Sequence, residues 1–135
     1  MEDFRDITVM IVDDKDTNAF VMRKMLEQIG VGRVIICHSG DDARAAIAQL
    51  PRIDLILLDL RLPDENGYEI YESLKTYSLL SEARFVAATA HVLPSEMRRT
   101  QDLGFDGFIS KPFRLCKLRE QIETILEGKS VWEPG

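Results

Sequence analysis

The stretch Leu55-Ile56-Leu57-Leu58-Asp59 decides the fold of this chain. Four apolar residues without polar alternation are typical of a central strand that is buried on both faces, as strands of parallel sheets are. An aspartate follows this strand directly. Three other strand-like runs also end at polar residues: 9–12 before Asp13-Asp14, 85–88 before Thr89, and 108–110 before Lys111.

Strand-like runs alternate with amphipathic segments along the chain, which predicts an α/β protein with a doubly wound parallel sheet. A further strand at 34–37 brings the predicted sheet to five strands. Five helices are predicted: 15–29, 39–50, a segment ending near 76, 94–104 and 114–126. The first should bury Val21, Met25, Leu26 and Ile29. We expect one domain over residues 1–127 and a loose tail over 128–135.

Composition limits the functions to consider. The 135 residues carry a net charge of −6, whereas nucleic-acid binding needs a basic stripe. No run is long and apolar enough to span a membrane, and the polar start is unlike a secretory signal, so we expect a cytoplasmic protein. Cys37 and Cys116 form no metal-binding or CxxC pattern, and we expect two reduced cysteines packed as small hydrophobes.

Three carboxylates should meet at one edge of the sheet, because the carboxyl ends of parallel strands lie together. Asp13-Asp14 taken alone could be a helix N-terminal pair. With Asp59 at another strand end, mutual repulsion favours a bound cation. Oxygen ligands suit Mg²⁺ (or Mn²⁺), which keeps several waters and needs only two or three carboxylates.

Asp59 is the candidate nucleophile, since an aspartate can attack a phosphoryl group and form an acyl phosphate. Such transfer requires charge neutralisation at the phosphoryl oxygens. The Thr89 hydroxyl and the Lys111 ammonium, at neighbouring strand ends, could each take one oxygen. A cis bond before Pro112 would form a tight turn that aims Lys111 into the site.

The chain resembles the receiver domain of two-component response regulators over about residues 8–126. The resemblance rests on four stretches in this order and spacing: 11–14 (IVDD), 58–63 (LDLRLP) with Asn66-Gly67, 88–90 (ATA) and 111–113 (KPF). It implies a flavodoxin-like fold with sheet order 2-1-3-4-5.

The resemblance also implies the chemistry. Asp59 would accept phosphate from a sensor histidine kinase or a histidine phosphotransfer protein, and the protein would catalyse only its own phosphorylation and slow dephosphorylation. Asp13 and Asp14 match the acidic metal pair, and the Arg61 backbone carbonyl would supply another metal ligand beside Asp59. Thr89 and Lys111 match the residues that respond to the phosphoryl group.

Three residues are expected to adjust this response. Phe108 stands where the family often has an aromatic residue that turns inward on activation, although it could simply be a core residue. Arg61 and His91 stand where side chains tune the lifetime of the acyl phosphate, although both could be ordinary solvated residues.

Partners are expected to be proteins, because no output domain accompanies the receiver. The resemblance places kinase docking near Lys15, Asn18 and Met22. It suggests a stand-alone regulator, monomeric or weakly dimeric through the fourth helix, fifth strand and fifth helix. This output face would lie around four residues: Glu96, Arg99, Phe108 and Lys117. Trp132 in the tail could stay disordered, or cover a groove or a dimer seam.

Three other functions compete with this one. A phosphatase of the haloacid dehalogenase type requires an acidic residue two positions after the nucleophile, where this chain has Arg61. A flavin nucleotide carrier requires a hydroxyl- and glycine-rich phosphate loop after its first strand, where this chain has Asp13-Asp14. A receiver that signals without phosphate is the third, although every side chain needed for phosphorylation is present.

Overall fold

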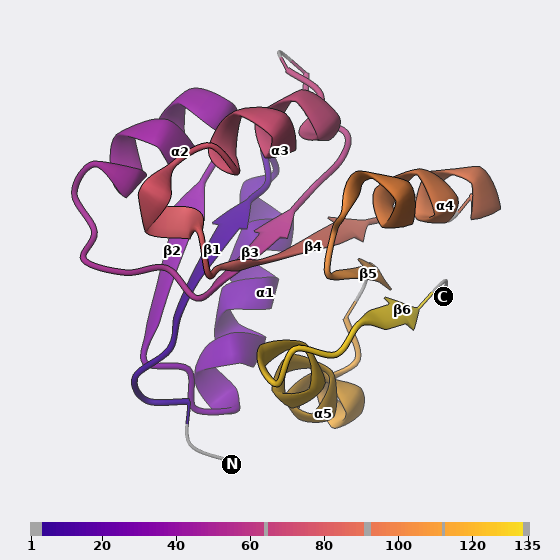
Figure 1. The fold of residues 1–135 in the computed structure, drawn as a ribbon. Coiled ribbons are helices and arrows are strands. Elements are labelled where there is room, and N and C mark those ends of the chain that lie inside the picture. The colour runs from indigo at the N-terminus through magenta and orange to yellow at the C-terminus, as the bar shows by residue number, and fades with distance from the viewer. Residues whose placement is uncertain (1–3, 64, 91–92, 112, 134–135) are drawn as a thin grey trace.

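One twisted parallel sheet forms the centre of the molecule (Figure 1). The computed structural model describes residues 4–63, 65–90, 93–111 and 113–133. Within them the strand order is β2-β1-β3-β4-β5-β6, which confirms the predicted flavodoxin-like order and adds a sixth strand. The strands are β1 (Thr8–Val12), β2 (Arg33–Cys37), β3 (Leu55–Leu58), β4 (Arg84–Thr89), β5 (Gly107–Ser110) and β6 (Val131–Glu133).

Helices cover both faces of the sheet (Figure 1). Their bounds are α1 (Asp16–Gln28), α2 (Gly40–Ile47), α3 (Gly67–Leu74), α4 (Pro94–Leu103) and α5 (Leu115–Leu126), with a short 3₁₀ turn η1 (Ser78–Leu80). Residues of α1 and α5 share one apolar core, and residues of α2, α3 and α4 share the other. The chain therefore forms the three-layer arrangement that the βα repeat predicts.

The strands supply both cores by strict alternation of side chains. In β3, Leu55 and Leu57 belong to the core under α1 and α5, whereas Ile56 and Leu58 belong to the core under α2–α4. All four are almost completely buried. An unbroken apolar run is thus required because each face of this strand is covered.

Local signals at the helix ends agree with the structure. The Asn66 side chain accepts a hydrogen bond from the Glu69 N–H at 2.9 Å, and Glu69 reaches back to Asn66, which makes a capping box at α3. Pro94 occupies the first turn of α4 as predicted, and Gly104 closes that helix. Helix α2 ends at Ile47, earlier than predicted.

The predicted buried face of α1 is partly wrong. Ala19, Met22 and Leu26 point into the core, while Val21 is 48% exposed. Two apolar rows with helical spacing run along this helix, one through Met22 and Leu26 and the other through Val21 and Met25. Periodicity alone does not determine which row faces the sheet.

The prediction of a loose tail is also wrong for three residues. Val131–Glu133 pairs in parallel with β5, so the sheet has six strands in the described part of the chain instead of five. Helix α5 is the crossover between these two strands. A three-residue strand gives almost no periodic signal, and the outer edge of β5 provides the hydrogen-bonding groups that order it.

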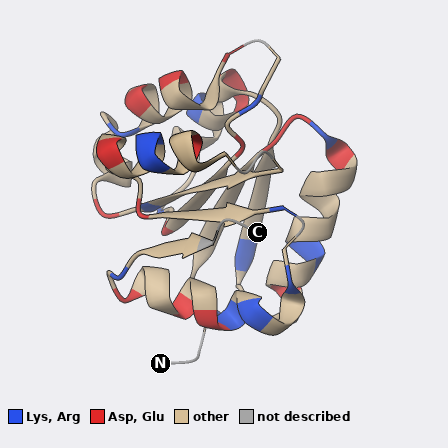
Figure 2. Ribbon diagram, turned by 90° about the vertical axis from the view of Figure 1, so that its right-hand side faces the viewer, with Lys and Arg blue, Asp and Glu red and all other residues tan. Residues whose placement is uncertain are grey.

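Charged residues lie mainly on the helices and loops, while most of the sheet is uncharged (Figure 2). Acidic and basic residues are interspersed along the helices in this view. Among the described residues, no helix is long and apolar enough to cross a bilayer.

The two cysteines have different environments. Cys37 is buried at the end of β2, and burial raises the pKa of its thiol to about 11. Cys116 is exposed near the start of α5, so the expectation that both pack as small hydrophobes is wrong for this residue.

We predict that one thiol reacts with a disulfide reagent at pH 8 in the native protein and that two react after denaturation. Thiolate is the reactive form, and both burial and the raised pKa suppress it at Cys37. Absorbance of the released thiol measures the stoichiometry. The Cys116→Ser variant should show no rapid reaction, and a rapid reaction in that variant would contradict the assignment.

Candidate functional site

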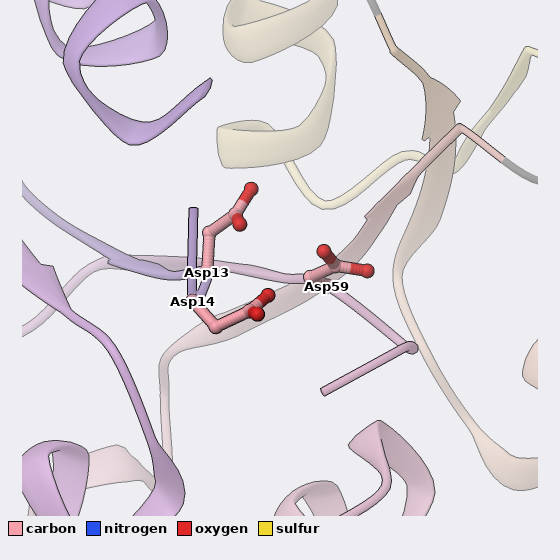
Figure 3. A group of neighbouring side chains, drawn as sticks. All are labelled: Asp13, Asp14 and Asp59. Atoms are coloured by element: carbon pink, nitrogen blue, oxygen red, sulfur yellow. The ribbon is translucent and has the colours of Figure 1, made fainter. Parts of the chain in front are cut away.

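The three aspartates gather at the carboxyl edge of the sheet (Figure 3). Asp13 and Asp14 follow β1, and Asp59 follows β3, its direct neighbour. The ladder continues one residue beyond the strands, because the Asp59 N–H donates to the Val12 carbonyl at 2.9 Å. Each aspartate offers an oxygen within 4.8 Å of the others. The register of two adjacent strands therefore creates the acidic cluster.

Among the described residues, Lys111 is the one whose ammonium group contacts these carboxylates. Its Nζ donates to Asp13 Oδ2 at 2.7 Å and to Asp59 Oδ2 at 3.1 Å. The lysine follows β5, and its N–H donates to the Thr89 carbonyl at 2.8 Å, which fixes the base of the long side chain. Lys111 and both carboxylates are largely buried, so this charge interaction is shielded from water.

Each carboxylate oxygen of Asp59 accepts a hydrogen bond from a different donor. Oδ1 accepts from the Arg61 N–H at 2.9 Å, and Oδ2 accepts from Lys111. Burial nevertheless raises the pKa of Asp59, and the Arg61 N–H and the Lys111 charge oppose this rise only in part. The folded protein thus makes the charged form of Asp59 less favourable than water does.

The donor set fits a hard divalent cation. Asp14 Oδ1 is buried and has no hydrogen-bond partner among the described residues, although a buried carboxylate oxygen normally has one. The cluster contains three carboxylates against one ammonium, and its ligands are all oxygen. Both features suit Mg²⁺, which prefers oxygen and offsets excess negative charge.

Thr89 and Phe108 occupy neighbouring strands beside the cluster. Thr89 is fully buried at the end of β4 and is paired in register with Ser110 of β5. Phe108, also fully buried, faces the core under α2–α4. This position agrees with the core alternative for Phe108. His91 and Pro112, two further predicted residues, lie outside the described residues.

Arg61 points away from the carboxylates and joins a network that sequence reasoning missed. Its guanidinium lies 2.6 Å from Glu96 Oε1 on α4, and the Tyr68 hydroxyl donates to Glu96 Oε2 at 3.0 Å. Arg99 stacks over the Tyr68 ring at 3.8 Å. Burial and the bond to Glu96 raise the pKa of Tyr68 to about 12, so the phenol remains a donor.

This network lines an open groove of about 620 Å³ between the loop after β3 and the start of α4. Glu96 was expected on an exposed output face, yet only 14% of its side chain is accessible. The sequence contains one indication of the pairing between Arg61 and Glu96, since both residues follow strands that end at this edge of the sheet. It offered none for Tyr68, whose partner is far away in the chain.

A second groove, of about 310 Å³, lies beside Lys111 on the α1 side. It is lined by Asn18, Val21, Met22, Met25, Ala90, Lys111 and Phe113. Phe20 is 55% exposed on the same helix. Met22, which was expected to be a docking residue, is itself buried, and the accessible apolar side chains are Phe20 and Val21.

Gly67 allows the start of α3 to approach the loop after Asp59. A Cβ at this position would lie 2.6 Å from the Leu60 Cα and 2.7 Å from the Asp59 carbonyl oxygen. Both neighbours are backbone atoms, so they cannot move away without displacing the loop that carries Asp59.

We predict that Gly67→Ala destabilises the protein by about 1–3 kcal/mol, the usual cost of overpacking. Chemical denaturation followed by circular dichroism measures this change. The control Glu120→Ala, at an exposed position on α5, should leave stability nearly unchanged. Equal stability of Gly67→Ala and the parent would contradict the close backbone approach.

Fold and site together define a flavodoxin-like α/β domain with an acidic, lysine-bearing pocket at the carboxyl edge of its sheet. Residues 9–123 match the family model described as the response regulator receiver domain. The chain therefore belongs to the response regulator receiver family of two-component systems.

Similar proteins include both small and large ones. The polar-differentiation response regulator DivK of Brucella anthropi is 32% identical, over 88% of this chain and 95% of DivK. Hybrid signal transduction histidine kinase L of Dictyostelium discoideum is 35% identical over 85% of this chain, which spans only 7% of that kinase. The solved CheY-like receiver domain protein of Methanospirillum hungatei has a TM-score of 0.78 at 25% identity, covering 90% of this chain and 94% of that one.

Proposed function

We propose that this chain is a response regulator receiver that accepts a phosphoryl group on Asp59 and responds through Thr89 and Lys111. The observation that carries the proposal is the buried contact between Lys111 Nζ and Asp59 Oδ2 at 3.1 Å, inside a cluster of three carboxylates. Phosphorylation on aspartate is general for the family to which residues 9–123 belong. Its expected location is the cytoplasm.

Asp59 has the environment of a nucleophile. In the proposed reaction an Asp59 carboxylate oxygen bonds to phosphorus while the bond from phosphorus to the donor's imidazole nitrogen breaks, and the donor leaves as a histidine. The Arg61 N–H orients the carboxylate through Oδ1. Lys111, already at Oδ2, neutralises charge that develops on the phosphoryl oxygens. The Thr89 hydroxyl is a further group assigned to those oxygens.

Asp13, Asp14 and Asp59 would hold Mg²⁺ or Mn²⁺, with the Arg61 backbone carbonyl as a further ligand. When bound, the cation supplies charge neutralisation at the phosphoryl oxygens. The unpartnered Asp14 Oδ1 supports a direct ligand role for this residue.

The phosphodonor is proposed to be a sensor histidine kinase or a histidine phosphotransfer protein. The apolar groove beside Lys111, together with exposed Phe20 and Val21, supports docking of an amphipathic helix next to the site. The exposed Phe20 and Val21 of α1 would thus make the docking contacts that were expected of Met22, which is buried.

We predict that incubation with Mg²⁺ and acetyl phosphate adds the mass of one phosphoryl group to the protein. Asp59→Asn removes the nucleophile and should stay unmodified, and EDTA should prevent labelling of the parent. Lys111→Ala should slow labelling, because one counter-charge is lost. Intact-mass spectrometry measures each result. An adduct in Asp59→Asn, or sustained turnover of a phosphomonoester, would sink the proposal.

Arg61 is proposed to set the lifetime of the acyl phosphate, together with His91. In the structure its guanidinium is engaged by Glu96, so Glu96 competes for the group that could shield a phosphoryl. We predict that Arg61→Ala shortens the lifetime. Glu96→Gln should lengthen it by up to about fivefold, in keeping with the roughly 0.2–1 kcal/mol of an ion pair whose arginine is open to solvent.

Decay of the phosphorylated protein after removal of the donor measures both lifetimes. Arg98→Ala is the matched control, because it removes an exposed arginine from α4, the helix that carries Glu96. Its phosphorylated form should decay at the rate of the parent. His91→Ala tests the second residue in the same assay. Unchanged decay in Arg61→Ala, His91→Ala and Glu96→Gln would show that these side chains do not control water at Asp59.

A further inference from the structure

Strand β6 covers the edge of β5, which would otherwise be the last strand of the sheet (Figure 1). Gly107, Phe108 and Ile109 pair in register with Val131, Trp132 and Glu133. Strand β6 has only three residues and pairs with one strand in the described part of the chain. Its first two residues are only half-buried. A short, partly exposed element at an edge is among the least stable parts of a fold.

The pairing depends on a residue without a side chain. A Cβ at Gly107 would lie 2.9 Å from the Val131 carbonyl oxygen, which is a backbone atom. The same Cβ would lie 3.5 Å from Val86 and 3.6 Å from Ile125, so there is little room for β5 to shift away. The close approach of β6 at this position therefore requires glycine.

Trp132 packs on the same side of the sheet as Phe108. Register partners in adjacent strands point to the same face. Both residues belong to the apolar cluster that also includes Met97 and Leu103 of α4. Phe108 has no exposed surface, although it lies on a strand that only β6 separates from solvent at that edge. Trp132 thus contributes to closing the apolar face between β5 and α4.

Strand β5 also leads directly into the site. Ser110, its last residue, pairs in register with Thr89, and the next residue is Lys111. The Lys111 N–H is bonded to the Thr89 carbonyl, and its Nζ contacts Asp13 and Asp59. A displacement of Thr89 or Lys111 would therefore act on β5, and through β5 on β6, which pairs with it.

We propose that β6 is a releasable cover: docked on β5 when Asp59 is free, and loosened when Asp59 is phosphorylated. A phosphoryl group brings about −1.5 to −2 charges and new acceptor oxygens between Thr89 and Lys111. Both groups move toward it and draw the end of β5, and β6 loses pairing first because it has one neighbouring strand. Phe108 then becomes accessible to a protein partner, together with more of the partly buried Met97 and Leu103. This inference rests on the proposed phosphorylation of Asp59.

The test uses Trp132, the only tryptophan of the chain, as its own reporter. The protein is incubated with Mg²⁺ and excess acetyl phosphate, and the mass adduct is measured in the same sample. We expect a red shift of Trp132 emission and easier quenching by acrylamide. Amide exchange over 131–133 should rise about tenfold, equivalent to about 1.4 kcal/mol of lost protection. Asp59→Asn should show none of these changes.

Two variants test the cover without phosphate. Trp132→Ala should raise amide exchange over 107–110 to the level of the phosphorylated parent, and Trp132→Phe, which retains a ring, should restore protection. An adduct on Asp59 with unchanged Trp132 emission and unchanged exchange over 131–133 would overturn the inference alone. Absence of any adduct in the parent would overturn the proposed function on which it rests.

Discussion

The crowding of three carboxylates around one ammonium is the constraint on which the site depends. Asp13 and Asp59 are adjacent because β1 and β3 are adjacent and in register. Lys111 balances part of their charge from β5, which lies two places away from β3 in the sheet. Burial makes this balance stronger than it would be in water and leaves a negative excess. A cation or a phosphoryl group that enters the site would change the charge around Lys111 and its two carboxylate partners.

Strand β5 is the element through which such a change can spread. One end carries Lys111, one neighbour carries Thr89, and the other neighbour is β6 with Trp132. The loop after β3 provides a separate link, because Arg61 reaches Glu96 on α4 and Tyr68 of α3 holds the same carboxylate. Helix α4 is therefore in contact with the site through two different routes, one apolar and one ionic.

The parts of the structure that the sequence predicted well are those with strong local signals. The run Leu55–Leu58 predicts a doubly covered strand, and Pro94 and Gly104 predict the two ends of a helix. The βα alternation predicts the sheet and thereby assigns the aspartates to one edge of it. The inward face of α1 was predicted only in part, because two apolar rows run along the same helix.

Sequence alone determined five strands and five helices in their order along the chain, and the chemical groups at the carboxyl edge, since periodicity, caps and strand-terminal polar residues are local properties of the chain. Tertiary structure decided which groups pair. Arg61 could face the carboxylates or α4, and the position of Glu96 in space selects α4. The residues after α5 could be a tail, but the open edge of β5 and the missing side chain of Gly107 let Val131–Glu133 become a strand. Both outcomes depend on contacts between residues distant in sequence, which no local pattern records.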